Sequence, residues 1–240
     1  MSEVATLGNI FFEPENTFQD LRRKPRFIIA GVILALLVGA YAFALNSKIG
    51  EAGIRAFVAE QMEKRAPNLD KETKEKQIDL QMTINKYTRF AVPIFVFVSF
   101  FVGGLLYWLG AKAFGGTGGF MHNLAVWVYS GFAPGVISLV ASFLVMALKS
   151  ADDIDLGASQ RGLVQQYTNL SFLVGKDHNI LATLIATFDI FTIWGWILAA
   201  IGLRVTNKLS KGSAWAVVLI ITLVGVIFRL IGSMLSGNPS

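Results

Sequence analysis

The chain has 240 residues, of which 54% are hydrophobic and only 15% charged, and its mean hydropathy is +0.57. Soluble domains carry about 25% charged residues, so this composition excludes an ordinary water-soluble protein and predicts a polytopic membrane protein. The chain contains no cysteine, which excludes disulfide scaffolds, thiol nucleophiles and cysteine-ligated zinc or iron–sulfur sites. The net charge of +5 needs no nucleic acid to explain it, because the basic cluster lies next to an apolar run.

Residues 1–26 form an amphipathic leader in which phenylalanines alternate with acidic residues. Pro14 suits the first turn of a short helix, and Pro25 ends that helix before the first apolar run. We expect an interfacial helix with its phenylalanine side in the head-group zone, and a disordered leader is the alternative. Anionic lipid head groups are the expected contact of the basic residues that follow, which are Arg22, Arg23, Lys24 and Arg26.

Several apolar stretches are long enough to cross a bilayer, which takes about 20 residues. The predicted spans, five in all, cover about 27–45, 90–110, 120–148, 179–203 and 213–234. The third is too long for a straight span, which suggests a kink at Pro134 or a first turn in the interface. A cleaved signal peptide is the alternative for the first, but its long, partly acidic leader favours a retained anchor.

The distribution of lysine and arginine predicts the orientation of these spans. Basic residues are denser in 1–26, 111–119 and 204–212 than in the alternate loops. The positive-inside rule therefore places the N-terminus in the cytoplasm and the C-terminus outside. We predict a multi-pass protein of the inner (plasma) membrane, with a cytoplasmic leader followed by a single membrane domain over 27–240.

The long loop 46–89 is predicted to form a helical hairpin over the outer mouth of the bundle. Residues 66–68 interrupt its helical pattern, and Asp70 is suited to cap a second helix that runs into the second span. The first arm carries an apolar stripe at helical spacing, made of Ile54, Phe57, Val58 and Met62. The predicted fold class is thus an all-α bundle of five transmembrane helices with an interfacial leader helix and an outer hairpin.

Two ionisable residues lie inside the predicted spans. Asp189 lies roughly 15 Å and Arg229 roughly 8 Å from the outer ends of their helices, at 1.5 Å per residue. A charge at the bilayer centre costs about 2.5–3.5 kcal/mol, so we expect the two to pair, directly or through water. The pair has two interpretations, a static clamp between helices and a site that responds to a proton or a substrate. In a third alternative Arg229 extends alone to the interface.

The third span contains a further group of polar residues. Pro134 releases a backbone carbonyl near residue 130, which needs a new donor inside the protein. A possible ligand pocket there comprises Tyr129, Ser130, Pro134 and Trp194. The alternative is a simple proline kink, with Trp194 as a packing residue.

No metal, cofactor or catalytic site is predicted. Asp152, Asp153 and Asp155 are spaced like the start of a calcium loop, but the position of its bidentate glutamate holds Leu163. The GGTGG run at 115–119 follows a span rather than a strand and lacks the lysine of a phosphate loop. We therefore expect that the protein is not an enzyme.

Several segments together resemble a known family. They are FEPxxxFxxLxxxP over 12–25, GGTGGF over 115–120 with LAV at 124–126 and residues 129–134, DxFxxWxxILxxxG over 189–202, and LSKGxA over 209–214. In order and spacing the chain resembles the bacterial branch of the Yip family, named for Ypt/Rab-interacting proteins. The resemblance implies a five-span membrane protein whose eukaryotic relatives contact prenylated Rab GTPases and shape endoplasmic reticulum and Golgi membranes. Bacteria lack Rab proteins, so that role is not carried over.

Two functional hypotheses follow. The first is a non-enzymatic membrane protein that organises the membrane or partner proteins, with lipids, a protein partner or a second copy of the chain as expected contacts and no nucleic acid. The second is a small transporter or channel with a midplane polar site around Asp189 and Arg229. A continuous polar cavity from Asp189 to a surface would favour transport.

Overall fold

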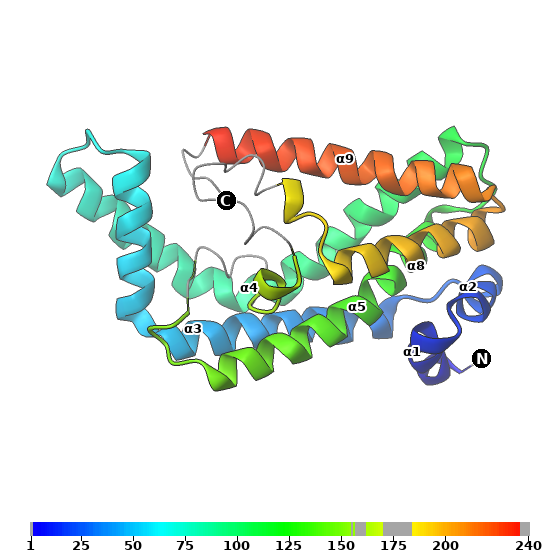
Figure 1. Ribbon diagram of the computed structural model, residues 1–240, viewed down its shortest axis with the longest axis horizontal. Coiled ribbons are helices and arrows are strands. Elements are labelled where there is room, and N and C mark those ends of the chain that lie inside the picture. The colour runs from blue at the N-terminus through cyan, green and yellow to red at the C-terminus, as the bar shows by residue number, and fades with distance from the viewer. Residues whose placement is uncertain (1, 155, 157–161, 170–183, 236–240) are drawn as a thin grey trace. The chain divides into compact units, whose positions relative to one another are not determined.

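The fold is seen in a computed structural model, which describes residues 2–154, 156, 162–169 and 184–235 (Figure 1). All regular elements within these residues are helices, and five of them are long and apolar enough to cross a membrane. The predicted all-α membrane fold with five spans is therefore confirmed. In chain order the helices are α1 (Glu3–Phe12), α2 (Pro14–Arg23), α3 (Ile28–Arg65), α4 (Lys71–Ala113), α5 (Phe120–Leu148), α6 (Gln165–Thr168), α8 (Ile190–Asn207) and α9 (Lys211–Leu235).

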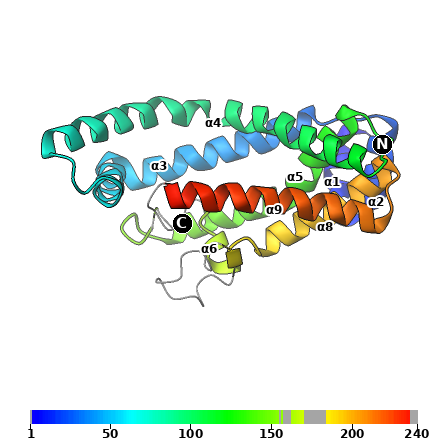
Figure 2. The ribbon, with the colours of Figure 1, turned by 90° about the horizontal axis from the view of Figure 1, so that it is seen from above.

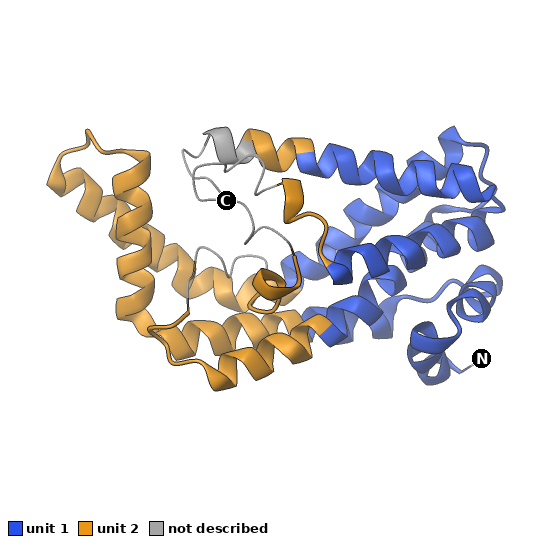
Figure 3. Cartoon of the chain, in the orientation of Figure 1, with its two compact units in different colours: residues 1–36, 94–137, 190–226 blue, residues 37–93, 138–189, 227–240 orange. Residues whose placement is uncertain are grey.

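The chain divides into two compact units (Figure 3). Unit 1 comprises residues 1–36, 94–137 and 190–226, and unit 2 comprises 37–93, 138–189 and 227–240. The leader belongs to unit 1 together with all of α8 and a part of α3, α4, α5 and α9.

The core of unit 1 depends on small residues that let helices approach each other closely. The indole of Trp127 on α5 lies so close to Gly103 on α4 that a Cβ there would fall 1.9 Å from the ring. Tyr107 packs edge-on against the same indole, with ring centroids 4.8 Å apart. Lipid supplies no hydrophobic force that pushes apolar helices together, so close packing of this kind is what holds membrane helices to one another.

Unit 2 contains the predicted helical hairpin. α3 changes direction at Gly50, whose φ of +74° favours glycine, and continues to Arg65. After a turn at 66–70, α4 begins at Lys71, and Asp70 caps it by accepting a hydrogen bond of 2.9 Å from the backbone N–H of Thr73. We call residues 51–89 the α3–α4 hairpin. Ion pairs join its two arms, namely Arg55 with Glu75 and Asp79, and Lys74 with Glu63.

Two elements differ from the prediction. The leader forms two helices rather than one, because Glu13 leaves helical geometry (φ −130°, ψ 61°) and Pro14 starts α2 anew. The fourth long helix begins only at Ile190 and ends at Asn207, whereas the predicted span covered 179–203. Residues 184 and 185 are helical and 186–187 form a turn, and 179–183 lie outside the described residues.

Candidate functional site

The leader packs against the membrane helices of unit 1. Ile10, Phe18 and Leu21 are fully buried, and α2 lies alongside α8 in both views (Figures 1 and 2). Phe18 fits over Gly202 of α8, where a Cβ would lie 2.9 Å from its ring. The predicted helix after Pro14 is thus present, but its apolar side is buried against protein rather than in lipid head groups.

The two phenylalanines of α1 differ in their surroundings. The ring of Phe11 packs edge-on against Phe132 of α5 and Trp194 of α8, at centroid distances of 6.3 and 6.2 Å. Phe132 is twelve residues from the start of α5, which is about 18 Å along the helix axis, so α1 lies beside the spans. Phe12, by contrast, is 87% exposed, and Val4 is also largely exposed. This outward side of α1 keeps the apolar character expected of an interfacial helix.

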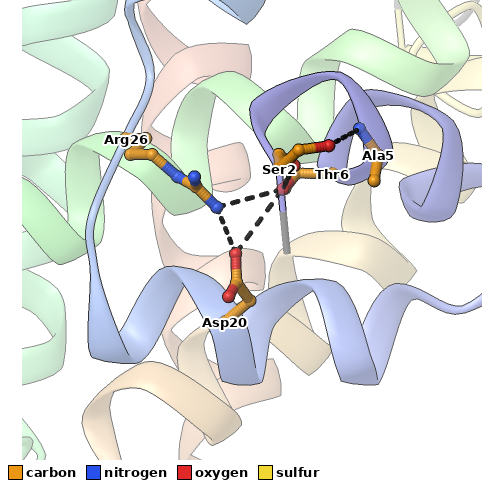
Figure 4. Close-up of polar contacts among 5 residues, drawn as sticks. All are labelled: Ser2, Ala5, Thr6, Asp20 and Arg26. Atoms are coloured by element: carbon orange, nitrogen blue, oxygen red, sulfur yellow. Dashed lines mark hydrogen bonds and ion pairs between the residues drawn. The ribbon is translucent and has the colours of Figure 1, made fainter.

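A polar cluster ties the leader to the segment that enters α3. Arg26 forms an ion pair with Asp20 of α2 and donates a hydrogen bond of 3.2 Å to the hydroxyl of Thr6 in α1 (Figure 4). Burial acts to raise the pKa of Asp20, but hydrogen bonds and the nearby Arg26 charge outweigh burial and hold it below its usual range. Arg26 is therefore engaged within the protein, and its expected contact with lipid head groups stays a prediction.

The other basic residues of the predicted head-group cluster point outward. Arg22, Arg23 and Lys24 are all exposed, so their contact with lipid stays a prediction.

Two more contacts fix α2 to the helices around it. Glu15 pairs with Arg204 of α8 at 2.8 Å. The carbonyl of Arg22 lies 3.1 Å from Nε2 of His122 in α5, whose Nδ1 accepts a hydrogen bond from the backbone N–H of Gly119. Since Nδ1 is an acceptor and a carbonyl can only accept, Nε2 carries the hydrogen and donates a hydrogen bond to the carbonyl oxygen of Arg22.

The residues of the predicted pocket lie where α5 and α8 meet. A Cβ on Gly195 of α8 would lie 3.5 Å from the Ser130 carbonyl oxygen and 3.7 Å from the Pro134 ring. The Ser130 hydroxyl donates to the carbonyl of Trp127 at 3.1 Å, and neighbouring Trp194 packs on Phe11 as described above. The structure thus brings these residues together as a helix contact.

Tyr129 differs from its neighbours. Its side chain is fully buried, and within the described residues its hydroxyl has no hydrogen-bond partner. A buried hydroxyl without a partner is costly in a protein interior. The contact between α5 and α8 therefore does not explain why a tyrosine occupies this position.

The structure does not bring Asp189 and Arg229 into an ion pair. Asp189 is 2% exposed, directly precedes α8, and accepts a hydrogen bond from the hydroxyl of Thr168 at the end of α6. Arg229 on α9 is exposed and forms no ion pair within the described part of the chain. Asp189 was expected deep in a continuous span, whereas it precedes a helix and bonds to Thr168 of a neighbouring segment.

A pair of buried asparagines was missed by the sequence reasoning. The side-chain amides of Asn123 in α5 and Asn207 in α8 bond to each other in both directions, at 3.0 and 3.1 Å, and both residues are fully buried. Thr117 donates to the Asn207 carbonyl from its backbone N–H at 3.0 Å, and a Cβ on Gly118 would lie 2.3 Å from the Asn207 amide oxygen. The GGTGG run is therefore a loop that wraps around Asn207. The signal in the sequence was an asparagine near the end of each of two apolar helices.

The comparisons with known proteins agree with this architecture. The model of the Yip1 domain matches residues 8–234. The chain is also similar to the membrane protein YknW of Bacillus subtilis, with 25% identity over 246 aligned positions that cover 98% of this chain and 93% of YknW. No solved structure matches the chain. Because the family model covers most of the leader and nearly all of the five long helices, the chain belongs to the Yip1 domain family of membrane proteins.

Proposed function

We propose that this protein is a non-enzymatic scaffold of the bacterial plasma membrane, whose cytoplasmic side holds a partner protein. The observation that carries the proposal is the docking of the leader on α5 and α8. Buried apolar side chains, aromatic contacts, a polar cluster and the Glu15–Arg204 ion pair all hold it there. A leader fixed in this way presents a defined surface, which a scaffold needs and a flexible tail lacks. We call α1, α2 and residues 24–27 the leader platform.

The use of polar side chains inside the bundle supports a scaffold over a transporter. Asn123 and Asn207 bond to each other, and Ser130 bonds to its own helix. In unit 2 the Tyr41 hydroxyl accepts a hydrogen bond from the backbone N–H of Leu163, and Asp189 accepts one from Thr168. Polar groups that line a transport path need to exchange partners with water or substrate, whereas these groups bond within the protein. Tyr129, whose hydroxyl has no partner among the described residues, is an exception.

The charge of the surface around the leader indicates what it would bind. Exposed basic residues occur on α2 and at the ends of the helices that the positive-inside rule assigns to the cytoplasm. They are Arg22, Arg23, Lys24, Lys112, Lys208 and Lys211, all in unit 1. A basic surface of this kind suits a partner with an acidic cytoplasmic segment, held close to anionic head groups.

Photocrosslinking in intact cells tests the proposal. A photoreactive residue at Lys24 is expected to give reproducible protein adducts, and one at the hairpin residue Lys71 is expected to give different ones. Gly202→Leu removes the space that Phe18 occupies, so it should release the leader and abolish the Lys24 adducts in protein that is still inserted. Unchanged adducts in that variant, or substrate flux by the purified protein in liposomes, would contradict the scaffold.

A further inference from the structure

The α3–α4 hairpin has a groove at its base, where its two arms continue into the apolar parts of α3 and α4. The groove has a volume of about 300 Å³ and lies within unit 2. Charged residues of both arms line it, and Ile54 and Met82 give it an apolar part. Its charged residues are Glu51, Lys86 and Arg89.

Arg89 is held in place by aromatic rings rather than by hydrogen bonds. Its guanidinium lies over the ring of Phe90 at 4.9 Å and over that of Phe43 at 5.8 Å. Such stacking fixes the position of the cation and leaves its N–H groups available. Within the described residues these N–H groups meet no acceptor, and Nε is even buried without one. Arginine has five N–H donors, so this side chain is oriented to receive an anionic group from outside the protein.

The two other charges of the groove are also without an ion pair among the described residues, whereas Arg55, Lys64, Lys74 and Lys76 elsewhere in the hairpin all have one. Lys86 lies three residues before Arg89 in α4, a spacing that puts both on one side of a helix. Glu51 follows Gly50, whose positive φ turns the chain at this point. The groove therefore combines two cations on one arm with one carboxylate on the other.

The location of the groove identifies its ligand. Arg89 directly precedes the uncharged run 90–110, and Phe43 belongs to the apolar first span. The rings of Phe43 and Phe90 that hold Arg89 are 47% and 62% exposed, and in a membrane this exposed surface faces acyl chains. Arginine and lysine suit the phosphate of a phospholipid, and the exposed rings beside them suit its acyl chains. The nearby carboxylate suits the amine of the head group.

We propose that this groove binds the head group of a phospholipid, with its phosphate on Arg89 and Lys86. Glu51 then receives the ammonium group of an ethanolamine head group, which gives the groove a preference for phosphatidylethanolamine over phosphatidylglycerol. This site is separate from the leader platform and does not depend on its function.

The test measures the thermal stability of the delipidated full-length protein in detergent with added ligand. Phosphatidylethanolamine is compared with diacylglycerol of the same acyl chains, which lacks the phosphate, and with inorganic phosphate, which lacks the tails. We expect phosphatidylethanolamine to raise the Tm most, and Arg89→Gln to weaken its apparent affinity about tenfold. Arg65→Gln, an exposed arginine of the hairpin outside the groove, is the matched control and should behave like the wild type.

Equal stabilisation by diacylglycerol, or equal responses of Arg89→Gln and Arg65→Gln, would overturn the proposal. Inorganic phosphate as effective as the lipid would show an anion site that does not recognise lipid, which also overturns it. If Arg89→Gln fails to fold, Lys86→Gln, compared with Lys71→Gln, replaces it, because both lysines are exposed. Glu51→Gln should abolish the preference for phosphatidylethanolamine over phosphatidylglycerol, and an unchanged preference would refute the role of Glu51.

Discussion

Replacing Phe18 with alanine tests whether the leader is held by its buried side chains. Phe18 is fully buried against Gly202, which has no side chain that could move into the vacated space. Truncation of a buried phenylalanine costs about 3–5 kcal/mol. If this cost falls on docking of the leader, the undocked population rises by about a hundredfold or more, because 1.4 kcal/mol is a factor of ten.

Limited trypsin digestion of the purified protein in detergent measures that population. Arg22 and Arg23 belong to the last turn of α2, so cleavage there requires the helix to open and follows the open fraction when closing is fast. Phe12→Ala provides a matched control in the same leader, since Phe12 is 87% exposed and should change the rate little. Equal cleavage rates in the two variants would refute the docking argument.

Three further predictions concern other contacts. Asn207→Leu leaves the buried amide oxygen of Asn123 without its donor and should lower stability by about 1–3 kcal/mol; the double variant with Asn123→Leu should regain part of the Tm, and no recovery would contradict a paired interaction. Arg26→Gln should speed tryptic release of the leader, whereas Lys24→Gln should not, and equal rates would show that the ion pair does not hold the leader. The cap of α4 by Asp70, whose pKa is lowered by hydrogen bonds from Thr73, should stabilise the hairpin above pH 3.8 and weaken as the pH falls through the lowered pKa. Hydrogen exchange of the α4 N-terminus, measured above pH 3.8 and below the lowered pKa, checks this. Asp70→Asn should show the same protection under both conditions.

The five spans and the hairpin could be predicted because they depend on local properties of the sequence. Uncharged runs of about 20 residues mark the spans, and the break at 66–68 with a capping residue at Asp70 marks the hairpin. Boundaries were less accurate where a helix continues beyond its apolar run, as α3 and α4 do. The late start of α8 was also missed, because residues 179–203 form one apolar run in which only Asp189 interrupts the pattern.

The packing of the leader could not be predicted, because an amphipathic helix shows the same pattern whether its apolar side meets lipid or protein. Whether the apolar side meets lipid or protein depends on the surface available to it. Here that surface includes Gly202 and Trp194 on α8, nearly two hundred residues further along the chain. The same holds for the asparagine pair, since Asn123 and Asn207 each look like an ordinary polar residue at a helix end.

Likewise the Asp189–Arg229 pair was inferred from the cost of isolated charges in the membrane. In the structure Asp189 instead precedes α8 and accepts a hydrogen bond from Thr168. Helix ends of this kind depend on tertiary contacts and are not visible in hydropathy.

Thiol crosslinking in native membranes tests the docking of the leader most directly. The chain has no cysteine of its own, so Glu15→Cys with Arg204→Cys introduces a single pair at the ion pair between α2 and α8. A bifunctional maleimide replaces the reach of the two long side chains, because a direct disulfide needs Cα atoms about 4.4–6.8 Å apart. We predict efficient intramolecular crosslinking, and little when Gly202→Leu, which removes the space for Phe18, is added. Free labelling of both cysteines without a crosslink would contradict the docked leader and the scaffold built on it.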